Sequence, residues 1–206
     1  RLTVMGMRGV DAIAHYRKQI NDAGSYRLAD HYGLALAQVK AGQYERARKE
    51  TVLLLEKKPE SMLFRLLHAQ IEAASGNRGK ALSIYQELYN ANRTSLSAAT
   101  YYADELKQQK KYAEARKVLR KAVRTYPRNV SLYRKLALVE SETGSQAESH
   151  RATAEAYALL GNYKLAIQQL NIARTHASKD DFYTQASITA RIKELQALDA
   201  LENQKK

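Results

Sequence analysis

The sequence contains no cysteine, no tryptophan, only two prolines and only nine glycines among its 206 residues. Without cysteine the chain can form neither a disulfide framework nor a thiolate metal site. So few glycines and prolines exclude collagen and an all-β fold with many turns. The longest purely aliphatic run, Val52–Leu55, is far too short to cross a bilayer. We therefore expect a protein that is not transmembrane and needs no disulfide bonds.

The composition is that of a folded, basic protein. Hydrophobic residues make up 45% and charged residues 27% of the chain, so it can build a core and is not a disordered polymer. The length suits one domain, or two small ones. The formal net charge of +13 favours an anionic partner or surface without proving one. Because the chain begins with Arg1, we expect it to be a piece of a longer protein.

A motif recurs along the chain at steps of 34 residues. It resembles Gly-x-Tyr-x-x-Ala, and a proline follows two of its copies at a separation of two periods. Its copies begin at Gly42, Gly76, Lys110 and Gly144, and the prolines are Pro59 and Pro127. This period is typical of tetratricopeptide (TPR) repeats, each of which is a pair of helices. The predicted fold is all-α: a TPR solenoid, which is a right-handed superhelix of antiparallel helix pairs, with a C-terminal capping helix.

The repeat phase also predicts the helices. We expect single helices at 8–23 and 129–143, and pairs at 26–41 with 43–57, 60–75 with 77–90, and 95–109 with 111–125. Another copy of the motif begins at Gly161, half a period after Gly144, so the helix at 146–160 should serve two repeats. A capping helix should begin near Asp181, where Ser178-x-x-Asp181 resembles a capping box. Its apolar face should comprise Ile188, Ile192, Leu195 and Leu198.

These elements predict four segments. Residues 1–25 form an N-terminal helix that links to an upstream domain absent from this sequence. Residues 26–177 form the TPR repeats, residues 178–201 form the capping helix, and residues 202–206 form a flexible tail.

Two segments resemble a known family. The first is Tyr32-Gly-Leu-Ala-Leu-Ala37, and the second runs from Glu148 to Leu170 and continues with Asp181-Phe-Tyr183. Both are similar to the TPR region of periplasmic M48-type zinc metalloproteases, in particular the β-barrel assembly-enhancing proteases. The resemblance implies a periplasmic location and a full-length zinc metalloprotease that binds its zinc through His-Glu-x-x-His outside this fragment. It also implies that the TPR half recruits the outer-membrane assembly machinery or unfinished β-barrel clients, and that it can contact its own protease domain.

No catalytic site is visible in the fragment. A zinc peptidase needs two histidines one helical turn apart, and no two of the five histidines have that spacing. The sequence also lacks a glycine-rich phosphate loop and a serine nucleophile elbow. We therefore expect no catalytic residue, no metal ligand and no cofactor in this fragment. The histidines are His15, His31, His68, His150 and His176.

The first candidate site is the concave groove of the solenoid. Mixed apolar and polar side chains at the groove positions suit an extended segment or a helix of a partner protein. The alternative is that these residues form ordinary surface and interhelical packing. The groove positions in the repeat phase are Tyr32, Leu36, Leu66, Gln70, Thr100, Asp104, Arg134, Leu138, Arg151 and Glu155.

The second candidate site is a basic stripe. Residues 107–135 hold eleven Lys or Arg against a single acidic residue, Glu114. Within this segment, five cations should share the convex face of one helix, and we call them the basic face. They could dock to an acidic protein or to anionic lipid headgroups, or they could simply be solvated. The basic face comprises Arg116, Lys117, Arg120, Lys121 and Arg124.

We expect no nucleic-acid partner, because only Tyr112 and Tyr126 are available there for stacking on bases. Reversing the charges of Arg116, Arg120 and Arg124 should scarcely alter the melting temperature, because exposed charges contribute little to folding. The alternative function is a stand-alone basic TPR scaffold that binds an anionic surface or nucleic acid in the cytoplasm.

Overall fold

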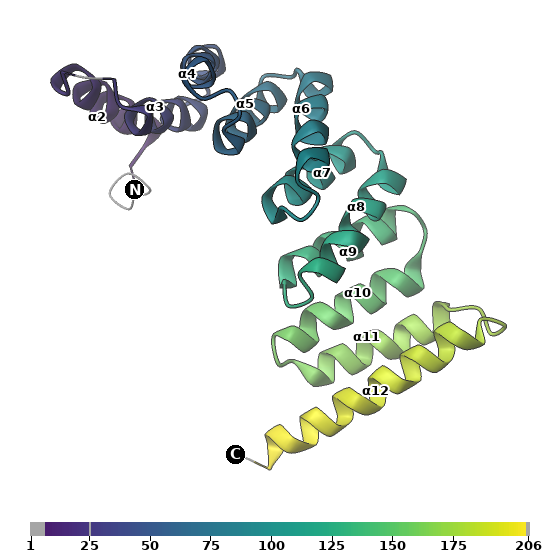
Figure 1. Ribbon diagram of the computed structural model, residues 1–206. Helices are drawn as coiled ribbons and strands as arrows, with labels where there is room; N and C mark the ends of the chain where they lie inside the picture. Colours follow the sequence, from purple (N-terminus) through teal and green to yellow (C-terminus); the bar gives the residue numbers. More distant parts are fainter. Residues whose placement is uncertain (1–6, 25, 205–206) are drawn as a thin grey trace. The chain divides into compact units, whose positions relative to one another are not determined.

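The computed structural model describes residues 7–24 and 26–204, and this part of the chain contains eleven α-helices and no strand (Figure 1). The all-α TPR fold predicted from the repeat is confirmed. The chain divides into two compact units, residues 1–93 and residues 94–206, and each is described by itself.

The described residues of unit 1 form five helices, and consecutive helices from α2 to α6 pack against each other. The Tyr16 side chain of the first helix packs directly on Gly33 of the second, where even a methyl group would collide with the ring. This close approach requires glycine at position 33. The helices are α2 (Gly9–Asp22), α3 (Leu28–Lys40), α4 (Tyr44–Lys57), α5 (Met62–Ala74) and α6 (Arg78–Ala91).

Unit 2 contains six helices in its described part, residues 94–204. Its fourth helix, α10, packs against both α9 and α11, as the half-period step in the sequence predicts. Thus α10 closes one helix pair and opens the next. The helices are α7 (Leu96–Gln108), α8 (Tyr112–Thr125), α9 (Val130–Glu142), α10 (Gln146–Leu159), α11 (Tyr163–His176) and α12 (Phe182–Asn203).

The repeat motif explains why the helices pair as they do. Its alanine is completely buried in three successive copies, at Ala47, Ala81 and Ala115, so the two helices of each pair can approach closely. The start of the motif lies in the turn between them and has a positive φ angle, as at Gly42 (72°) and Gly76 (94°). Such a residue ends a helix in the left-handed conformation. The motif therefore supplies both the close packing and the reversal of the chain.

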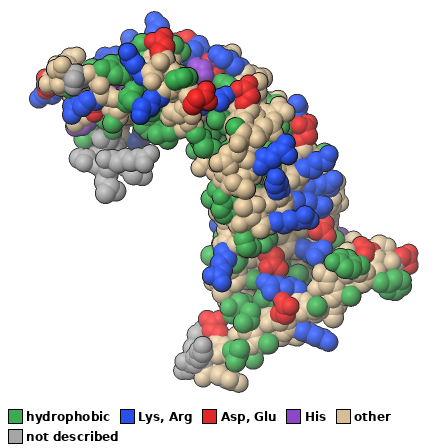
Figure 2. Space-filling model, viewed as in Figure 1, with side chains coloured by type: hydrophobic (Ala, Val, Ile, Leu, Met, Phe, Trp, Pro, Cys, Tyr) green, Lys and Arg blue, Asp and Glu red, His purple; other side chains and the backbone are tan. Residues whose placement is uncertain are grey.

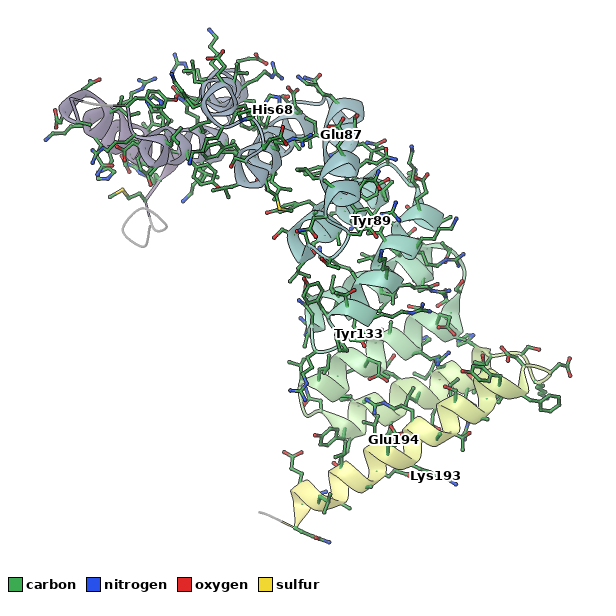
Figure 3. The ribbon with its side chains drawn as sticks, viewed as in Figure 1. His68, Glu87, Tyr89, Tyr133, Lys193 and Glu194 are labelled. Carbon is green, nitrogen blue, oxygen red and sulfur yellow. The ribbon has the colours of Figure 1, made fainter. Side chains whose placement is uncertain are left out.

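Helix α12 closes unit 2 and differs in detail from its prediction. Its residues Ile188, Ile192 and Leu195 are buried in a cluster with α10 and α11, whereas Leu198 is 41% exposed and lies outside this cluster. Asp181 caps the helix itself by accepting a hydrogen bond from the Thr184 backbone N–H at 3.0 Å, so it is not the third residue of a capping box. The side chains of Lys193 and Glu194 are exposed on this helix (Figure 3).

The helix boundaries agree closely with the predicted ranges, although α12 continues to Asn203, beyond the predicted capping segment. Of the predicted segments, residues 1–6, 25 and 205–206 lie outside the described residues. Among the helices that the structure describes, none is long and apolar enough to cross a membrane.

Candidate functional site on the flanks of α9

A basic hollow of about 240 Å³ lies beside α9, on the flank that it shares with α7 and α8. The Nζ atom of Lys135 lies 2.7 Å from both carboxylate oxygens of Asp104, so this pair is neutralised within the chain. The cations Lys107 and Arg134 also line the hollow and form no ion pair with any described residue. Leu138 adds an apolar side chain that is 47% exposed. This hollow thus offers two unpaired cations next to an exposed leucine.

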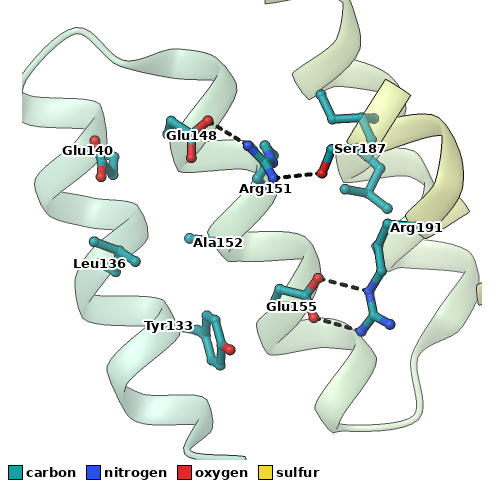
Figure 4. Close-up of a pocket in the computed structure, with 11 residues that line it drawn as sticks. Tyr133, Leu136, Glu140, Glu148, Arg151, Ala152, Glu155, Ser187 and Arg191 are labelled. Atoms are coloured by element: carbon teal, nitrogen blue, oxygen red, sulfur yellow. Dashed lines mark hydrogen bonds and ion pairs between the residues drawn. The ribbon is translucent and has the colours of Figure 1, made fainter. Parts of the chain in front are cut away.

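A second hollow, also of about 240 Å³, lies between α9, α10 and α12 (Figure 4). Arg191 of α12 donates two hydrogen bonds to Glu155 of α10, at 2.9 and 2.7 Å. Arg151 donates to Glu148 at 2.8 Å and to the Ser187 hydroxyl oxygen at 3.2 Å. Both arginines therefore hold the capping helix against α10.

The ion pairs set the electrostatics of the second hollow. Its hydrogen bonds to Glu155 raise the pKa of Arg191, so the guanidinium is always charged. Burial and then the negative charge of Glu155 raise the pKa of the Tyr133 hydroxyl, so this group stays neutral and can donate a hydrogen bond. Figures 3 and 4 show the Tyr133 ring on α9. The lining mixes apolar residues with arginines that are paired to glutamates, whereas the basic hollow holds two unpaired cations.

Helix α9 contributes residues to both hollows from opposite sides. At 100° per residue, Arg134 and Leu138 lie on one flank, and Tyr133 and Leu136 lie on the other. A ligand that crosses α9 could therefore touch both hollows.

The structure places the predicted groove residues in different environments. In unit 2 it brings Asp104, Arg134 and Leu138 together in the basic hollow, and Arg151 and Glu155 together in the second hollow. Thr100, which is partly buried, lines neither of them.

The groove residues of unit 1 pack differently. Leu66 is 7% exposed and belongs to the core, and the Tyr32 ring lies 6.0 Å from the ring of Phe64. Leu36 is 39% exposed, and Gln70 is half-buried.

Several residues of the hollows were missed by the repeat phase. Ser187 and Arg191 belong to α12, which the sequence indicated only as a terminal cap. Lys107 and Lys135 were counted in the charge of the basic segment but not placed in a groove. Lys135 lies one position after the groove residue Arg134, so the spacing of charges around groove positions could have revealed it.

The basic face on α8 divides into two parts. Arg120 donates a hydrogen bond to Oε1 of the buried Glu140 at 2.8 Å, and Nη1 of Arg116 lies 3.7 Å from Oε2 of the same carboxylate. Lys117, Lys121 and Arg124 are exposed and form no ion pair within the described part of the chain.

These ion pairs of Arg116 and Arg120 show that one prediction about the basic face is wrong, namely that reversing its charges would scarcely alter stability. Reversing the charges of Arg116, Arg120 and Arg124 together cannot leave stability unchanged, because two of these cations neutralise a carboxylate that is 1% exposed. Only Arg124 of the three is an exposed charge without such a partner.

The histidines lie in separate contacts. Nδ1 of His31 lies 2.8 Å from Oε2 of Glu50, and Nδ1 of His68 lies 3.0 Å from the Thr51 hydroxyl oxygen. The His150 and His176 rings stack with centroids 5.6 Å apart. Among the residues that the structure describes, no group of three or more His, Cys, Asp or Glu side chains could hold a metal ion.

Comparison with known families agrees with this architecture. Two models of the tetratricopeptide repeat match the chain, one over residues 32–95 and the other over residues 96–139. Residues 32–139 are therefore tetratricopeptide repeats. Because such repeats are protein-binding modules, the chain is a protein-interaction scaffold.

Solved structures show the same fold at low sequence identity. MamA from Desulfovibrio magneticus RS-1 is 18% identical, with a TM-score of 0.57 over 91% of this chain and 96% of that one. A tetratricopeptide repeat protein from Parabacteroides merdae is 16% identical, with a TM-score of 0.57 over 93% of this chain and 78% of that one. YrrB, described as a TPR protein with an unusual peptide-binding site, is 15% identical, with a TM-score of 0.57 over 78% of this chain and 82% of that one. No curated protein sequence matches the chain. The likeness to M48-type metalloproteases thus rests on the sequence segments alone.

Proposed function

We propose that the chain binds a partner protein through the basic hollow between α7 and α9. The observation that carries this proposal is the pair of cations, Lys107 and Arg134, which stand beside the exposed Leu138 and have no acidic partner in the described chain. An extended segment with an acidic residue next to an apolar one would complement both features. The second hollow, across α9, gives such a segment polar groups for its backbone.

The fold supports peptide binding in general terms. YrrB has the same fold and is described as having a peptide-binding site. Its low identity transfers no residue to this chain, so the binding residues proposed here come from the hollow itself.

We further propose that the partners are the outer-membrane assembly machinery or unfinished β-barrels in the periplasm, and that the protein can also contact its own protease domain. The support is the resemblance of residues 148–170, which form much of α10 and α11. Barrels that have not closed expose unpaired strand edges and apolar faces, and both suit a groove of mixed polarity. The same resemblance implies that zinc would be bound by the protease domain and not by this fragment.

The test is binding of a fluorescent peptide from a strand of an outer-membrane β-barrel, measured by anisotropy. The double variant R134E/L138D should weaken binding at least tenfold, because it removes an apolar anchor and reverses a charge at the centre of the site. The matched control is R46E/L53D in α4, where both side chains are also exposed and little change is expected. Equal weakening by the two variants would refute binding at the basic hollow.

A peptide of the same composition but scrambled order tests whether the hollow prefers strands of β-barrels to other peptides. If R134E/L138D weakens binding of both peptides equally, the hollow binds proteins without preference for barrel strands. If neither variant affects the strand peptide, the alternative of a scaffold for anionic surfaces gains support, and the outer face of α8 is its best site.

A further inference from the structure

The cations of residues 107–135 are not equivalent in the structure. Glu140 engages Arg116 and Arg120, and Asp104 engages Lys135. The exposed cations of α8 form no ion pair with the described residues. In Figure 2, Lys and Arg side chains gather over the part of the molecule where Figure 1 shows α8. The unpaired cations of this helix are Lys117, Lys121 and Arg124.

We propose that Lys117, Lys121 and Arg124 form a docking surface for an acidic segment of a partner protein. Successive members are four and three residues apart, so they lie along one line on the helix surface. Carboxylates one helical turn apart on a partner helix could pair with neighbouring members of this line. This surface lies on α8 and is independent of the proposed binding at the basic hollow.

An ion pair within the chain shows that cations of α8 can bind a carboxylate. On the other edge of the basic face, Arg116 and Arg120 are one turn apart and converge on the single carboxylate of Glu140, from the following helix. Lys117, Lys121 and Arg124 repeat that spacing of cations, but no carboxylate of the described residues forms an ion pair with them. A glutamate or aspartate from another protein would supply the missing group, with charge-assisted hydrogen bonds.

The neighbouring residues favour a protein over a membrane or a nucleic acid. The large apolar residues Val118 and Leu119 of α8 are buried, and the helix exposes no large apolar side chain that could insert into lipid. The Tyr126 hydroxyl donates to the Thr94 carbonyl, and Tyr112 is partly buried, so neither tyrosine is fully exposed for base stacking. Charge is the main feature that the surface offers.

The experiment uses the full chain and a labelled alanine-based helical peptide with glutamates one turn apart. The triple variant K117E/K121E/R124E should bind this peptide at least about tenfold more weakly, since three exposed ion pairs of modest strength are replaced by repulsion. The matched control R17E/K18E/K49E makes the same change in net charge on exposed residues of unit 1 and should bind within about twofold of the parent chain. Both variants should melt like the parent, because none of these six side chains forms an ion pair with a described residue.

Two further probes test the class of partner. Vesicles of phosphatidylglycerol with phosphatidylcholine, and a short DNA duplex, are compared with the peptide at the same salt concentration. Preference for the peptide, lost in the triple variant, supports an acidic protein. Tighter binding to vesicles or DNA that depends on the same three residues would overturn the protein partner, and equal losses in the two charge variants would overturn the docking surface itself.

Discussion

Units 1 and 2 each bury a glutamate at the same position of the repeat, and they neutralise it differently. Glu72 in α5 and Glu140 in α9 are 68 residues apart, which is two periods, and their side chains are 0% and 1% exposed. A buried carboxylate is costly unless cations and hydrogen-bond donors satisfy it. Both units use an arginine of the preceding helix for this purpose, Arg48 in unit 1 and Arg116 in unit 2.

The other groups that donate hydrogen bonds to the buried glutamate differ between the two units. Glu72 also accepts hydrogen bonds from Asn77 and Lys80, each at 2.7 Å. Two periods later these positions are Ser145 and Glu148, which give no such bonds to Glu140. Unit 2 compensates with Arg120, and Oε2 of Glu140 has no hydrogen bond within the described structure.

The comparison shows why α8 is so basic. Arg120 of α8 takes the place of Asn77 and Lys80, which neutralise the buried glutamate of unit 1 from the start of α6. A buried acid with few donors depends strongly on each of them, so unit 2 should be the more sensitive of the two to loss of arginine.

The largest expected effect is in unit 2. The double variant R116M/R120M removes both cations from Glu140 and should lower the free energy of unfolding by about 3–5 kcal/mol, because a buried charge is left unpaired. Urea denaturation, with hydrogen exchange of the α9 amides to identify the unit that unfolds, would measure it. Adding E140L should restore most of the loss, since it removes the uncompensated charge. A loss below about 1 kcal/mol would show that Glu140 is not held by these arginines.

The next effect is the acid sensitivity of unit 1. Burial alone would raise the pKa of Glu72, but hydrogen bonds from Lys80 and Asn77 and the charges of Lys80 and Arg48 lower it to about 2. Because the folded pKa lies below the unfolded value of 4.5, this group stabilises the fold above about pH 4.5, and the contribution is lost as the pH falls towards 2.

We expect a loss of roughly 2 kcal/mol over this range, since the Lys80 side chain is 56% exposed and solvent screens its charge. The E72Q variant should lack this part of the pH dependence. Melting curves of the two proteins between about pH 6 and pH 2 would compare them, and parallel curves would contradict the role of Glu72.

Arg48 should matter less than the arginines of unit 2. The variant R48M leaves Glu72 with Asn77 and Lys80, so its cost should be about 1 kcal/mol, the value of one hydrogen bond. The measurement is the same urea titration, with hydrogen exchange in α5 as the reporter. A cost equal to that of R116M/R120M would remove the proposed difference between the units.

The helices could be predicted from the sequence because the repeat motif contains the residues that end one helix and pack it against the next. The copies that begin at Gly42, Gly76 and Lys110 contain both the turn residue and a small buried alanine, so their phase locates the helix ends of 26–143. The half-period step at Gly161 likewise predicts that α10 is shared by two pairs. These signals are local, and they lie within one helix pair.

The site could be predicted only in part, because its contacts join residues far apart in the sequence. Arg120 and Glu140 are 20 residues apart, and Glu155 and Arg191 are 36 apart. Periodicity indicates which face a side chain occupies but not which partner it meets there. For this reason the cations of the basic face could be predicted to share one face of a helix. The sequence could not predict that two of them pair with Glu140 while the other three stay exposed to solvent.

The smallest expected effect concerns the turns that begin the motif copies. Glycine occupies this position at Gly42, Gly76 and Gly144, but the copy between α7 and α8 has Lys110, with φ = 58°. Lys110 is the one residue other than glycine with positive φ among the described residues. Its backbone makes the same turn, since the N–H of Lys111 bonds to the Leu106 carbonyl at 2.8 Å.

The variant K110G should therefore stabilise unit 2 by about 0.5–1 kcal/mol. A side chain in the left-handed conformation costs about 1–2 kcal/mol, and the greater entropy of glycine in the unfolded chain offsets part of the gain. The control K110A removes the same charge but keeps a Cβ atom, so it should not stabilise the protein. If K110A raises the urea midpoint as much as K110G does, the gain comes from relieving repulsion in the basic segment and not from the backbone. The reverse change in unit 1, G76K, should cost about 1 kcal/mol, because Gly76 has φ = 94° and a side chain there would be strained.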